Sequence, residues 1–273
     1  MLDRLIVVDS VTRLGPETQG RVLIGGSHGG VYAAYLAAKT SASGVILNDA
    51  GIGLDRAGIA GLTYLDRLSI PGATISHRSA RIGDGFDMLG RGIVSHANAA
   101  AAALGIEPGM WCREAARRLA RAPAAGSNAP ESAESRFALT LPNARKARAS
   151  ALDSNALLTP KDIGGIVVTG SHGALPGGNP ANAVRQDVFA ALYNDADGGV
   201  EGAGFTRLPA LDARNIAAAT YSAWTARIGD GRSGYETGVV SAVNRRASAL
   251  GARLGASVKE FVAVMADAID KGN

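Results

Sequence analysis

The sequence predicts an α/β fold made of two copies of one βαβαβα unit, with mostly parallel sheets covered by helices and a pseudo-two-fold axis between the copies. Three observations support this prediction: polar, glycine-rich segments recur at a nearly constant offset, short apolar runs alternate with alanine-rich runs, and glycines bound the apolar runs. Fully apolar strands are typical of sheets that are buried on both faces. We expect a first repeat over 1–121, a linker rich in Ala, Pro and Ser with a short strand over 122–150, and a second repeat over 151–273.

Three motifs define the repeat. They are Gly26-Ser27-His28-Gly29 with Gly170-Ser171-His172-Gly173, Asn48-Asp49-Ala50 with Asn194-Asp195-Ala196, and Ala80-Arg81-Ile82-Gly83-Asp84-Gly85 with its unchanged copy at 226–231. The offset is 144 residues for the first motif and 146 for the other two. The second half therefore holds two extra residues, which we place in the Pro- and Gly-rich loop at 176–180.

Each half is predicted to alternate strands and helices. In the first half the short apolar runs at 21–24, 44–47 and 73–75 predict strands, and the runs at 31–39, 59–68 and 88–104 predict helices, the last ending at Gly105 as a C-cap. The second half repeats the strands at 166–168, 190–193 and 219–221, and a further short strand is expected at 137–141.

Composition narrows the function classes. Of the 273 residues, 47% are hydrophobic and 19% charged, which is ordinary for a globular protein with a full core. The formal net charge is +4, but the arginines are scattered and no nucleic-acid motif accompanies them, so we expect no nucleic-acid partner. No apolar run approaches about 18 residues and no signal sequence is visible. We therefore expect a cytoplasmic protein without a membrane partner, and a homo-oligomer.

The shared motifs indicate a small-molecule site. All three follow predicted strands, and in open α/β sheets ligands bind at the carboxyl ends of the strands. Turn-forming preference alone explains Gly, Asn and Asp there, but not a shared Arg, His and Ser. We expect substrate to be bound by the following residues: Gly26, Gly29, Asn48, Arg81, Asp84, Ser171, His172, Asn194, Asp195, Arg227 and Asp230.

Gly25-Gly26-Ser27-His28-Gly29 fits the pattern G-x-S-x-G between a predicted strand and a predicted helix. In this detail it resembles the nucleophile elbow of the α/β-hydrolases, where a strained turn exposes the serine hydroxyl. The resemblance covers these five residues and their flanks. That family places its serine after several strands, and Thr169 replaces the first glycine in the second half, so the family is not assigned. The alternative is a glycine-rich turn whose backbone N–H groups hold a carboxylate or phosphate.

Histidine, aspartate and arginine supply the remaining candidates. His28 has the counterpart His172, whereas His77 has Ala223 in its place, so His77 is the group that would make one half-site active. Asp49 is a candidate to orient a histidine, and Arg81 is suited to bidentate capture of a carboxylate or to pairing with a loop aspartate. We expect no metal, because no ligand spacing supports one, and no cofactor, because no nucleotide motif is present; the single Cys112 excludes a cysteine-based zinc site.

The leading hypothesis is a hydrolase that acts on a small amide, ester or cyclic amide bearing a carboxylate, with Ser27, His28, Asp49 and His77 as catalytic residues. Ser27 or a water would attack, His28 or His77 would act as the base, and Asp49 would orient it. A lyase or isomerase that uses the same His and Asp groups is one alternative. A non-catalytic protein that binds an anionic metabolite is the other.

Overall fold

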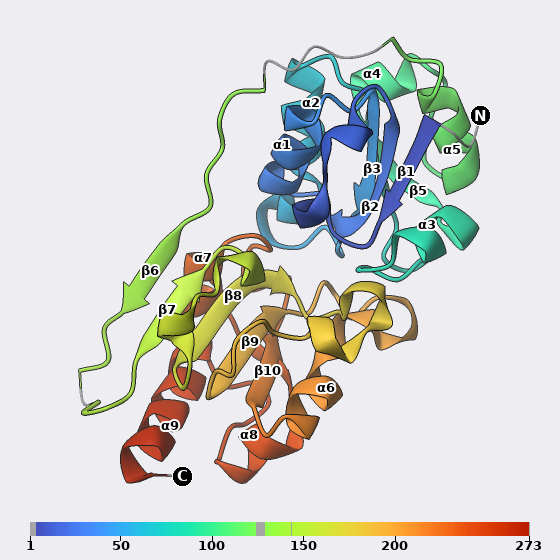
Figure 1. Cartoon of the computed structure of the whole chain (residues 1–273). Coiled ribbons are helices and arrows are strands. Elements are labelled where there is room, and N and C mark those ends of the chain that lie inside the picture. Colours follow the sequence, from blue (N-terminus) through green and yellow to red (C-terminus); the bar gives the residue numbers. More distant parts are fainter. Residues whose placement is uncertain (1–3, 124–128, 143, 273) are drawn as a thin grey trace.

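The computed structural model describes residues 4–123, 129–142 and 144–272 and shows two mostly parallel mixed sheets, each with helices (Figure 1). The first sheet has the strand order β1-β2-β3-β4-β5 and the second β11-β10-β9-β8-β7-β6. In each sheet four neighbouring strands are parallel, and β5 and β11 are antiparallel edge strands. The chain is an α/β protein. Among the residues described, no helix combines the length and the apolarity needed to cross a bilayer.

The first half contains five strands and five α-helices among the described residues. The strands are β1 Leu5–Val8, β2 Val22–His28, β3 Gly44–Asn48, β4 Gly72–Ile75 and β5 Val94–Ala97. The helices are α1 Val31–Lys39, α2 Gly61–Arg67, α3 Gly85–Arg91, α4 Ala99–Ala102 and α5 Cys112–Leu119. A 3-10 segment, Leu54–Ile59, connects β3 to α2.

The second half repeats the strand order and adds one strand. Its strands are β6 Arg136–Leu139, β7 Ala149–Leu152, β8 Ile166–His172, β9 Ala190–Asn194, β10 Ala217–Tyr221 and β11 Val240–Val243. Its helices are α6 Arg207–Ala213, α7 Gly231–Thr237, α8 Arg245–Ala249 and α9 Val258–Lys271. The connecting chain runs down one side of the molecule before β6 pairs antiparallel with β7 (Figure 1). The short strand expected at 137–141 is therefore present as β6.

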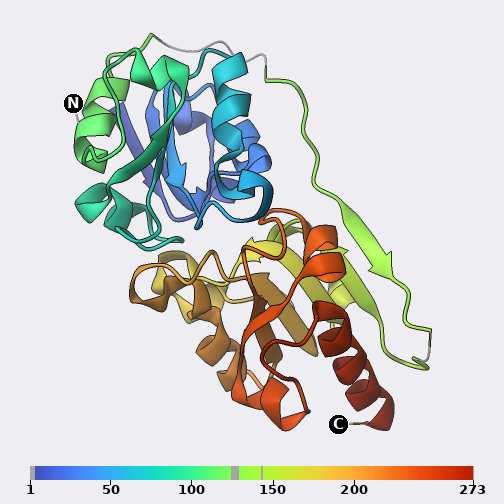
Figure 2. The same ribbon diagram turned by 180° about the vertical axis from the view of Figure 1, so that it is seen from behind.

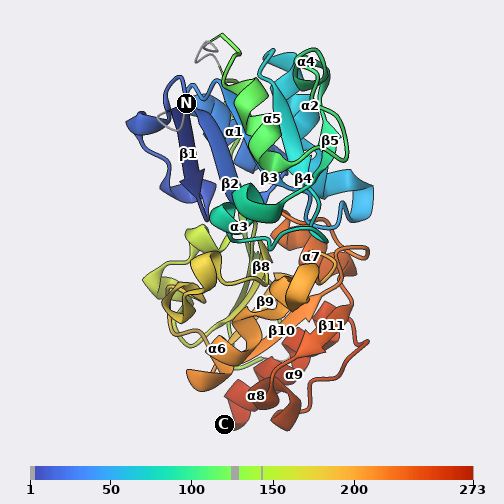
Figure 3. The ribbon, with the colours of Figure 1, turned by 90° about the vertical axis from the view of Figure 1, so that its right-hand side faces the viewer.

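Each sheet is buried on both faces, which explains why its strands are apolar throughout. In β2, Val22 and Ile24 pack with α3 and α5, whereas Leu23 between them packs with α1 and α2 on the other face. Figures 2 and 3 show the first sheet between these two helical layers. In the second half Val168 belongs to the cluster with α9 and Val167 to the cluster with α6. Alternation of side chains between faces thus builds two cores per half.

The prediction of one helix over 88–104 is wrong. α3 ends at Arg91, and Gly92 takes an extended conformation in which a Cβ would lie 2.4 Å from the carbonyl oxygen of Met88. Val94 is then buried in β5, which pairs antiparallel with β4, and a new short helix starts after its N-cap Asn98. The alanine-rich composition of this segment obscured a strand between two short helices. Gly105 does follow the last turn, with φ of +75°.

Among the residues that the structure describes, the second half has no helix corresponding to α1. At the place of that helix it has the 3-10 turns Pro176–Gly178 and Pro180–Asn182. Proline lacks an N–H and glycine favours non-helical conformations, so this segment cannot continue as a helix. By the strand register, the two extra residues lie between β8 and β9, in the segment that contains these turns. The two halves therefore differ beside the Gly-Ser-His-Gly motifs.

The carboxyl ends of the two sets of parallel strands face each other, as the strand arrowheads in Figure 1 show. The loops that follow these strands bond across the junction: Leu54 N donates to Ala223 O, Val200 N to His77 O and Gly177 N to Gly83 O, each at 2.8 Å. A small apolar cluster with members from both halves fills the centre; it contains Ala50, Ile82, Ala174, Ala196, Ala203 and Ile228. The strand-end loops are thus buried against each other over part of their length.

Close backbone packing at the strand ends predicts a strong effect of one glycine substitution. A Cβ at Gly204 would lie 1.9 Å from the carbonyl oxygen of Asp195. We expect Gly204→Ala to lower the free energy of unfolding by about 3 kcal/mol, because backbone must move to admit the methyl group. Gly90→Ala is the control: a Cβ there meets nothing within 4 Å in α3, and we expect a gain of up to about 1 kcal/mol. Urea unfolding of both variants measures the difference, and equal stability of the two would contradict this account.

Candidate functional site

The Gly-Ser-His-Gly and Arg-Ile-Gly-Asp-Gly motifs occur together because each histidine packs against the glycine of the opposite half. A Cβ at Gly229 would lie 3.1 Å from His28 Cε1, and a Cβ at Gly83 would lie 3.3 Å from His172 Cε1. Both glycines also have φ near +80°, where other residues are strained. Within one half, Gly83 N donates to Gly26 O at 2.8 Å. The motif glycines thus permit the contact between the halves.

The shared Asn and Asp residues stabilise the loops after β3 and β9. Asn48 accepts a hydrogen bond from Ala50 N at 2.9 Å and donates to Ala80 O, and Asn194 makes the corresponding bonds. Asp49 accepts from Gly51 N and from His77 N. These side chains are buried and do not line the cleft described below. Their hydrogen-bond capacity is used by backbone groups.

Arg81 and Arg227 form ion pairs that bridge the two halves. Arg81 pairs with Asp84 at 2.9 Å in its own loop and with Glu201 of the other half at 2.8 Å. Arg227 pairs in the same way with Asp230 and Asp55; Asp84 and Asp230 also cap α3 and α7. The structure therefore places both arginines, expected to bind substrate, in a network of protein carboxylates.

His77 lies between two carboxylates at the junction. Its Nδ1 is 2.8 Å from Asp49 Oδ1 and its Nε2 is 3.1 Å from Asp197 Oδ2 of the other half. Burial alone would lower the pKa of His77, but the hydrogen bond and charge of Asp49, with Asp197, outweigh it and raise the pKa. Asp195, which faces Ala223 instead of a histidine, has its pKa raised by burial, whereas the pKa of Asp49 is lowered because the bonds from His77 outweigh its burial.

Gly51 is the counterpart of Asp197 and makes this arrangement sterically possible. A Cβ at Gly51 would lie only 2.3 Å from the Cβ of Asp197. Positive φ does not distinguish the two positions, because Asp197 itself has φ of +58°. The close approach of Asp197 from the opposite half therefore requires a residue without a Cβ at position 51, and the positive φ of the turn also favours glycine there. In the described residues no group of three or more His, Cys, Asp or Glu side chains is arranged to hold a metal ion.

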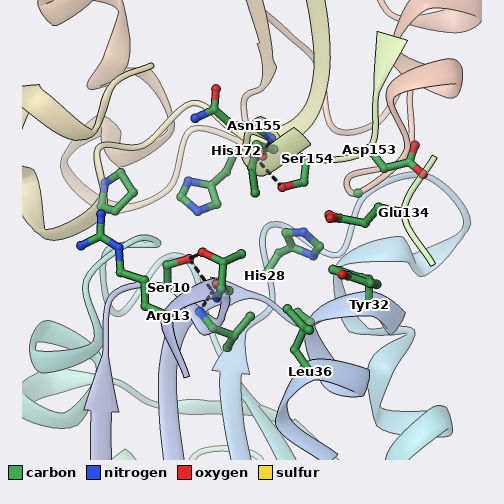
Figure 4. Close-up of a pocket in the computed structure, with 18 of the residues that line it drawn as sticks. Ser10, Arg13, His28, Tyr32, Leu36, Glu134, Asp153, Ser154, Asn155 and His172 are labelled. Carbon is green, nitrogen blue, oxygen red and sulfur yellow. Dashed lines mark hydrogen bonds between the residues drawn. The ribbon is translucent and has the colours of Figure 1, made fainter. Parts of the chain in front are cut away.

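A cleft of about 140 Å³ lies between the two Gly-Ser-His-Gly motifs (Figure 4). Both halves line it: Ser27 and His28 come from the end of β2, and Ser171 and His172 from the end of β8. Of the residues that the motifs predicted as a site, the structure brings these four together at the cleft. A cavity of about 150 Å³ is filled by benzene, so this one suits a ligand of on the order of six to ten non-hydrogen atoms.

His28 presents a hydrogen-bond donor to the cleft. Its Nδ1 accepts from Gly30 N at 3.1 Å, which leaves the proton of the neutral ring on Nε2. Burial lowers the pKa of His28 to about 4, so the ring is neutral at physiological pH. Burial, with Arg207 and His28 nearby, lowers the pKa of His172 well below its ordinary value. Sequence reasoning expected His28 to act as a base, but this tautomer makes it a donor.

Ser27 lacks the geometry of a nucleophile elbow. It is the penultimate residue of β2 and is not among the described residues with positive φ. Its Oγ accepts a hydrogen bond from Val11 N at 3.1 Å, and Ser171 Oγ likewise accepts from Asn155 N at 2.8 Å. No histidine among the described residues hydrogen-bonds to Ser27 Oγ. The serines therefore hold the loops after β1 and β7, and the likeness to the α/β-hydrolase elbow does not extend to three dimensions.

Two carboxyl groups and a phenol lie at one end of the cleft, where Figure 4 shows Glu134, Asp153 and Tyr32 together. Burial raises the pKa of Glu134 to about 7; a hydrogen bond from Ser154 opposes this rise and the charge of Asp153 adds to it. Burial also raises the pKa of Asp153, although Ser135 N donates to it at 2.6 Å. At neutral pH Glu134 therefore populates both its protonated and its ionised form.

Arginines line the rest of the cleft. Arg13 lies at the end away from Glu134 (Figure 4) and donates to Asn182 Oδ1 at 2.9 Å. Arg185 also lines the cleft, and neither arginine makes an ion pair with any residue that the structure describes. Arg207 is buried and is used differently: it donates to Asn182 O and His172 O and stacks on Tyr193. Arg13 and Arg185 thus remain suited to a carboxylate.

Sequence reasoning missed Arg13, Tyr32, Glu134 and Arg185. None of them belongs to a repeated motif, and Glu134 lies in a segment whose composition indicated a linker. The pairing of Ser135 N and O with Asp153 holds that segment at the end of β7. The stretch is rich in Ala, Pro and Ser and holds two glutamates, and nothing local distinguished Glu134 from the exposed Glu131.

The ion pair of His77 predicts a pH-dependent contribution to stability. A raised folded-state pKa contributes stability that is present below the ordinary value of about 6.5 and is lost as the pH rises through the folded value. We expect His77→Ala to lower the free energy of unfolding by ~3 kcal/mol at pH 6 and by clearly less at pH 9. His96→Ala is the control, because burial lowers the pKa of His96 and its contribution changes in the opposite direction. Urea unfolding at the two pH values would refute this prediction if His77→Ala cost the same at both.

Comparison with models of known protein families finds no match, and comparisons with curated proteins and with solved structures find none either. The geometry of the cleft therefore carries the functional argument. That geometry combines a carboxyl group of pKa about 7, a neutral imidazole that donates through Nε2, and arginines without protein carboxylate partners.

Proposed function

We propose that this chain is an enzyme that acts on a small carboxylate-bearing compound by general acid–base catalysis in the cleft between the two halves. The reaction favoured is hydrolysis of an amide, ester or cyclic amide by water. Glu134 carries the proposal, because a carboxyl group with a pKa near the working pH is an efficient proton acceptor and donor.

In this proposal Glu134, His28 and the two arginines act on different parts of the substrate. Glu134 as the carboxylate takes a proton from the attacking water and, once protonated, delivers it to the leaving nitrogen or oxygen. His28 Nε2–H donates to the oxyanion that forms on the attacked carbonyl, as a neutral ring preorganised by Gly30 N. Arg13 and Arg185 hold the substrate carboxylate. Ser27 is a scaffold residue here rather than the nucleophile.

An isomerase or lyase is the second candidate. The observation that favours it is that His28 and His172 come from opposite halves and line the same cleft. A carboxylate base beside neutral imidazole donors can remove a proton next to a carbonyl and stabilise the resulting enediolate. A trial in H₂¹⁸O and D₂O separates the classes: hydrolysis places ¹⁸O in the product, whereas enolisation places deuterium on carbon.

We also propose that the two halves, 1–121 and 151–273, arose by duplication and are related by a pseudo-two-fold axis, with 122–150 as the linker. Support comes from the common strand order and from corresponding contacts such as Leu54 N to Ala223 O and Val200 N to His77 O. Duplication explains why residues that hold the loops occur in both halves, whereas Glu134 and Arg13 occur in one place each. A homo-oligomer and a cytoplasmic location remain predictions.

Glu134→Gln is the decisive variant. We expect it to lower kcat by about 100-fold or more, because the amide cannot exchange protons. In the unaltered enzyme kcat/KM should rise with pH through about 7, as Glu134 loses its proton, and the residual activity of the variant should lack that rise. Glu131→Gln in the same segment is the matched control and should retain full activity. An unchanged pH profile in Glu134→Gln would remove Glu134 from the mechanism.

The same variant makes a prediction about stability. A carboxyl whose folded pKa lies above its ordinary 4.5 stabilises the fold below that value and loses this contribution as the pH rises through about 7. We therefore expect Glu134→Gln to melt at a higher temperature than the unaltered protein at pH 8, with the difference shrinking toward pH 4.5. Thermal unfolding followed by circular dichroism measures it, and a lower Tm at pH 8 would contradict the burial of this carboxyl group.

A further inference from the structure

The cleft carries opposite charge preferences at its two ends. At one end Arg13 offers unused N–H groups, and at the other end Glu134 and Asp153 lie beside Tyr32 (Figure 4). The two histidines between these ends are neutral. A ligand with only a negative charge satisfies the arginines but meets carboxyl groups at the far end. A ligand with only a positive charge has the reverse difficulty.

We propose that the cleft selects a compact zwitterion, with a carboxylate held by Arg13 and Arg185 and an ammonium or amidinium group held by Glu134 and Asp153. This inference rests on the proposed function for the identity of the site and adds the chemical class of the substrate. The small volume of the cleft limits the molecule to on the order of six to ten non-hydrogen atoms.

The acidic end has the acceptors that such a cation needs. Asp153 uses its oxygens to accept from Ser135 N and Gly231 N, and a carboxylate has further lone pairs for a ligand N–H. Glu134 contributes a second carboxyl group, and Tyr32 closes the same end from α1. Charge-assisted bonds to two carboxylates favour a cationic group over a neutral amine or hydroxyl. At the opposite end Asn182 orients Arg13 from the other half.

Binding of a cation at this end should release a proton. Glu134 lies with Asp153, Tyr32 and His28 at the cleft. The adjoining hollow, which Glu134 also lines, has Asp55, Arg227 and Asp230 as its further charged groups. Because Glu134 is largely protonated at pH 6, an ammonium group placed beside it favours the carboxylate form. One proton passes from Glu134 to the buffer when the ligand binds. The positive charge of the ligand then compensates the negative charge of the ionised Glu134.

Isothermal titration calorimetry with matched small probes tests the proposal on the full-length protein. The probes are unbranched ω-amino acids of three to six carbons, and the carboxylates and alkylammonium ions of the same lengths. We expect at least one ω-amino acid to bind about tenfold or more tightly than both singly charged probes of its length. Titrations at pH 6 in two buffers of different ionisation enthalpy should show release of up to about one proton per site.

Variants at the two ends of the cleft test which residue binds which charged group of the zwitterion. Arg13→Gln should remove the advantage of the zwitterion over the alkylammonium ion, and Glu134→Gln should remove its advantage over the carboxylate together with the proton release. Arg121 is exposed and does not line the cleft, so Arg121→Gln should change neither. The proposal fails if a carboxylate binds as tightly as the zwitterion, if no ω-amino acid binds, or if proton release persists in Glu134→Gln. Binding is measured without turnover, so loss of the proposed catalysis and loss of this selectivity are separate results.

Discussion

The contact between the two strand-end surfaces is the constraint on which the rest of this structure depends. Each Gly-Ser-His-Gly histidine packs on a glycine of the opposite half, at a separation that a Cβ would make tighter than most observed contacts. Other contacts also join the halves at this junction. They are the ion pairs of Arg81 and Arg227, the Asp49–His77–Asp197 cluster and the small apolar cluster at the centre. The shared histidines and arginines therefore join the halves, the shared asparagines and serines hold the loops within each half, and the cleft lies between the loops that these residues fix.

Much of the fold could be predicted from local pattern. α1 has the expected bounds because an alanine-rich run is delimited by Gly30 and Thr40, and the apolar runs of β3 and β4 are bounded by turn residues. β1, β5, β7 and β11 were not predicted. β5 and β11 are short edge strands whose residues carry no clear period, and pairing with a neighbouring strand, not local sequence, fixes them. These edge segments are therefore strands because they pair with a neighbouring strand in the folded protein.

The candidate site was predictable only where residues recur. His28 and His172 were identified through the repeat and do line the cleft, but the same reasoning selected Arg81 and Asn48, whose partners are protein groups. Residues that recur in both halves are those with the same structural role in each half, and that role is to form the loops at the junction. Glu134 and Arg13 give the cleft its asymmetry, and their proximity follows from a chain path that no local pattern encodes. The residues that give the cleft its asymmetry thus lie at positions that the two halves do not share.

The hydrogen bonds that cross the junction have a consequence for how a ligand enters. Leu54 N to Ala223 O and Val200 N to His77 O lie on strand-end loops of different halves, so a hinge motion that separated the sheets would break both, together with the Arg–carboxylate bridges. Proteins that close two lobes around a ligand usually open between them. Here a ligand should enter and leave without separation of the two sheets. The association rate of a ligand should accordingly be indifferent to a crosslink that fastens the two sheets together.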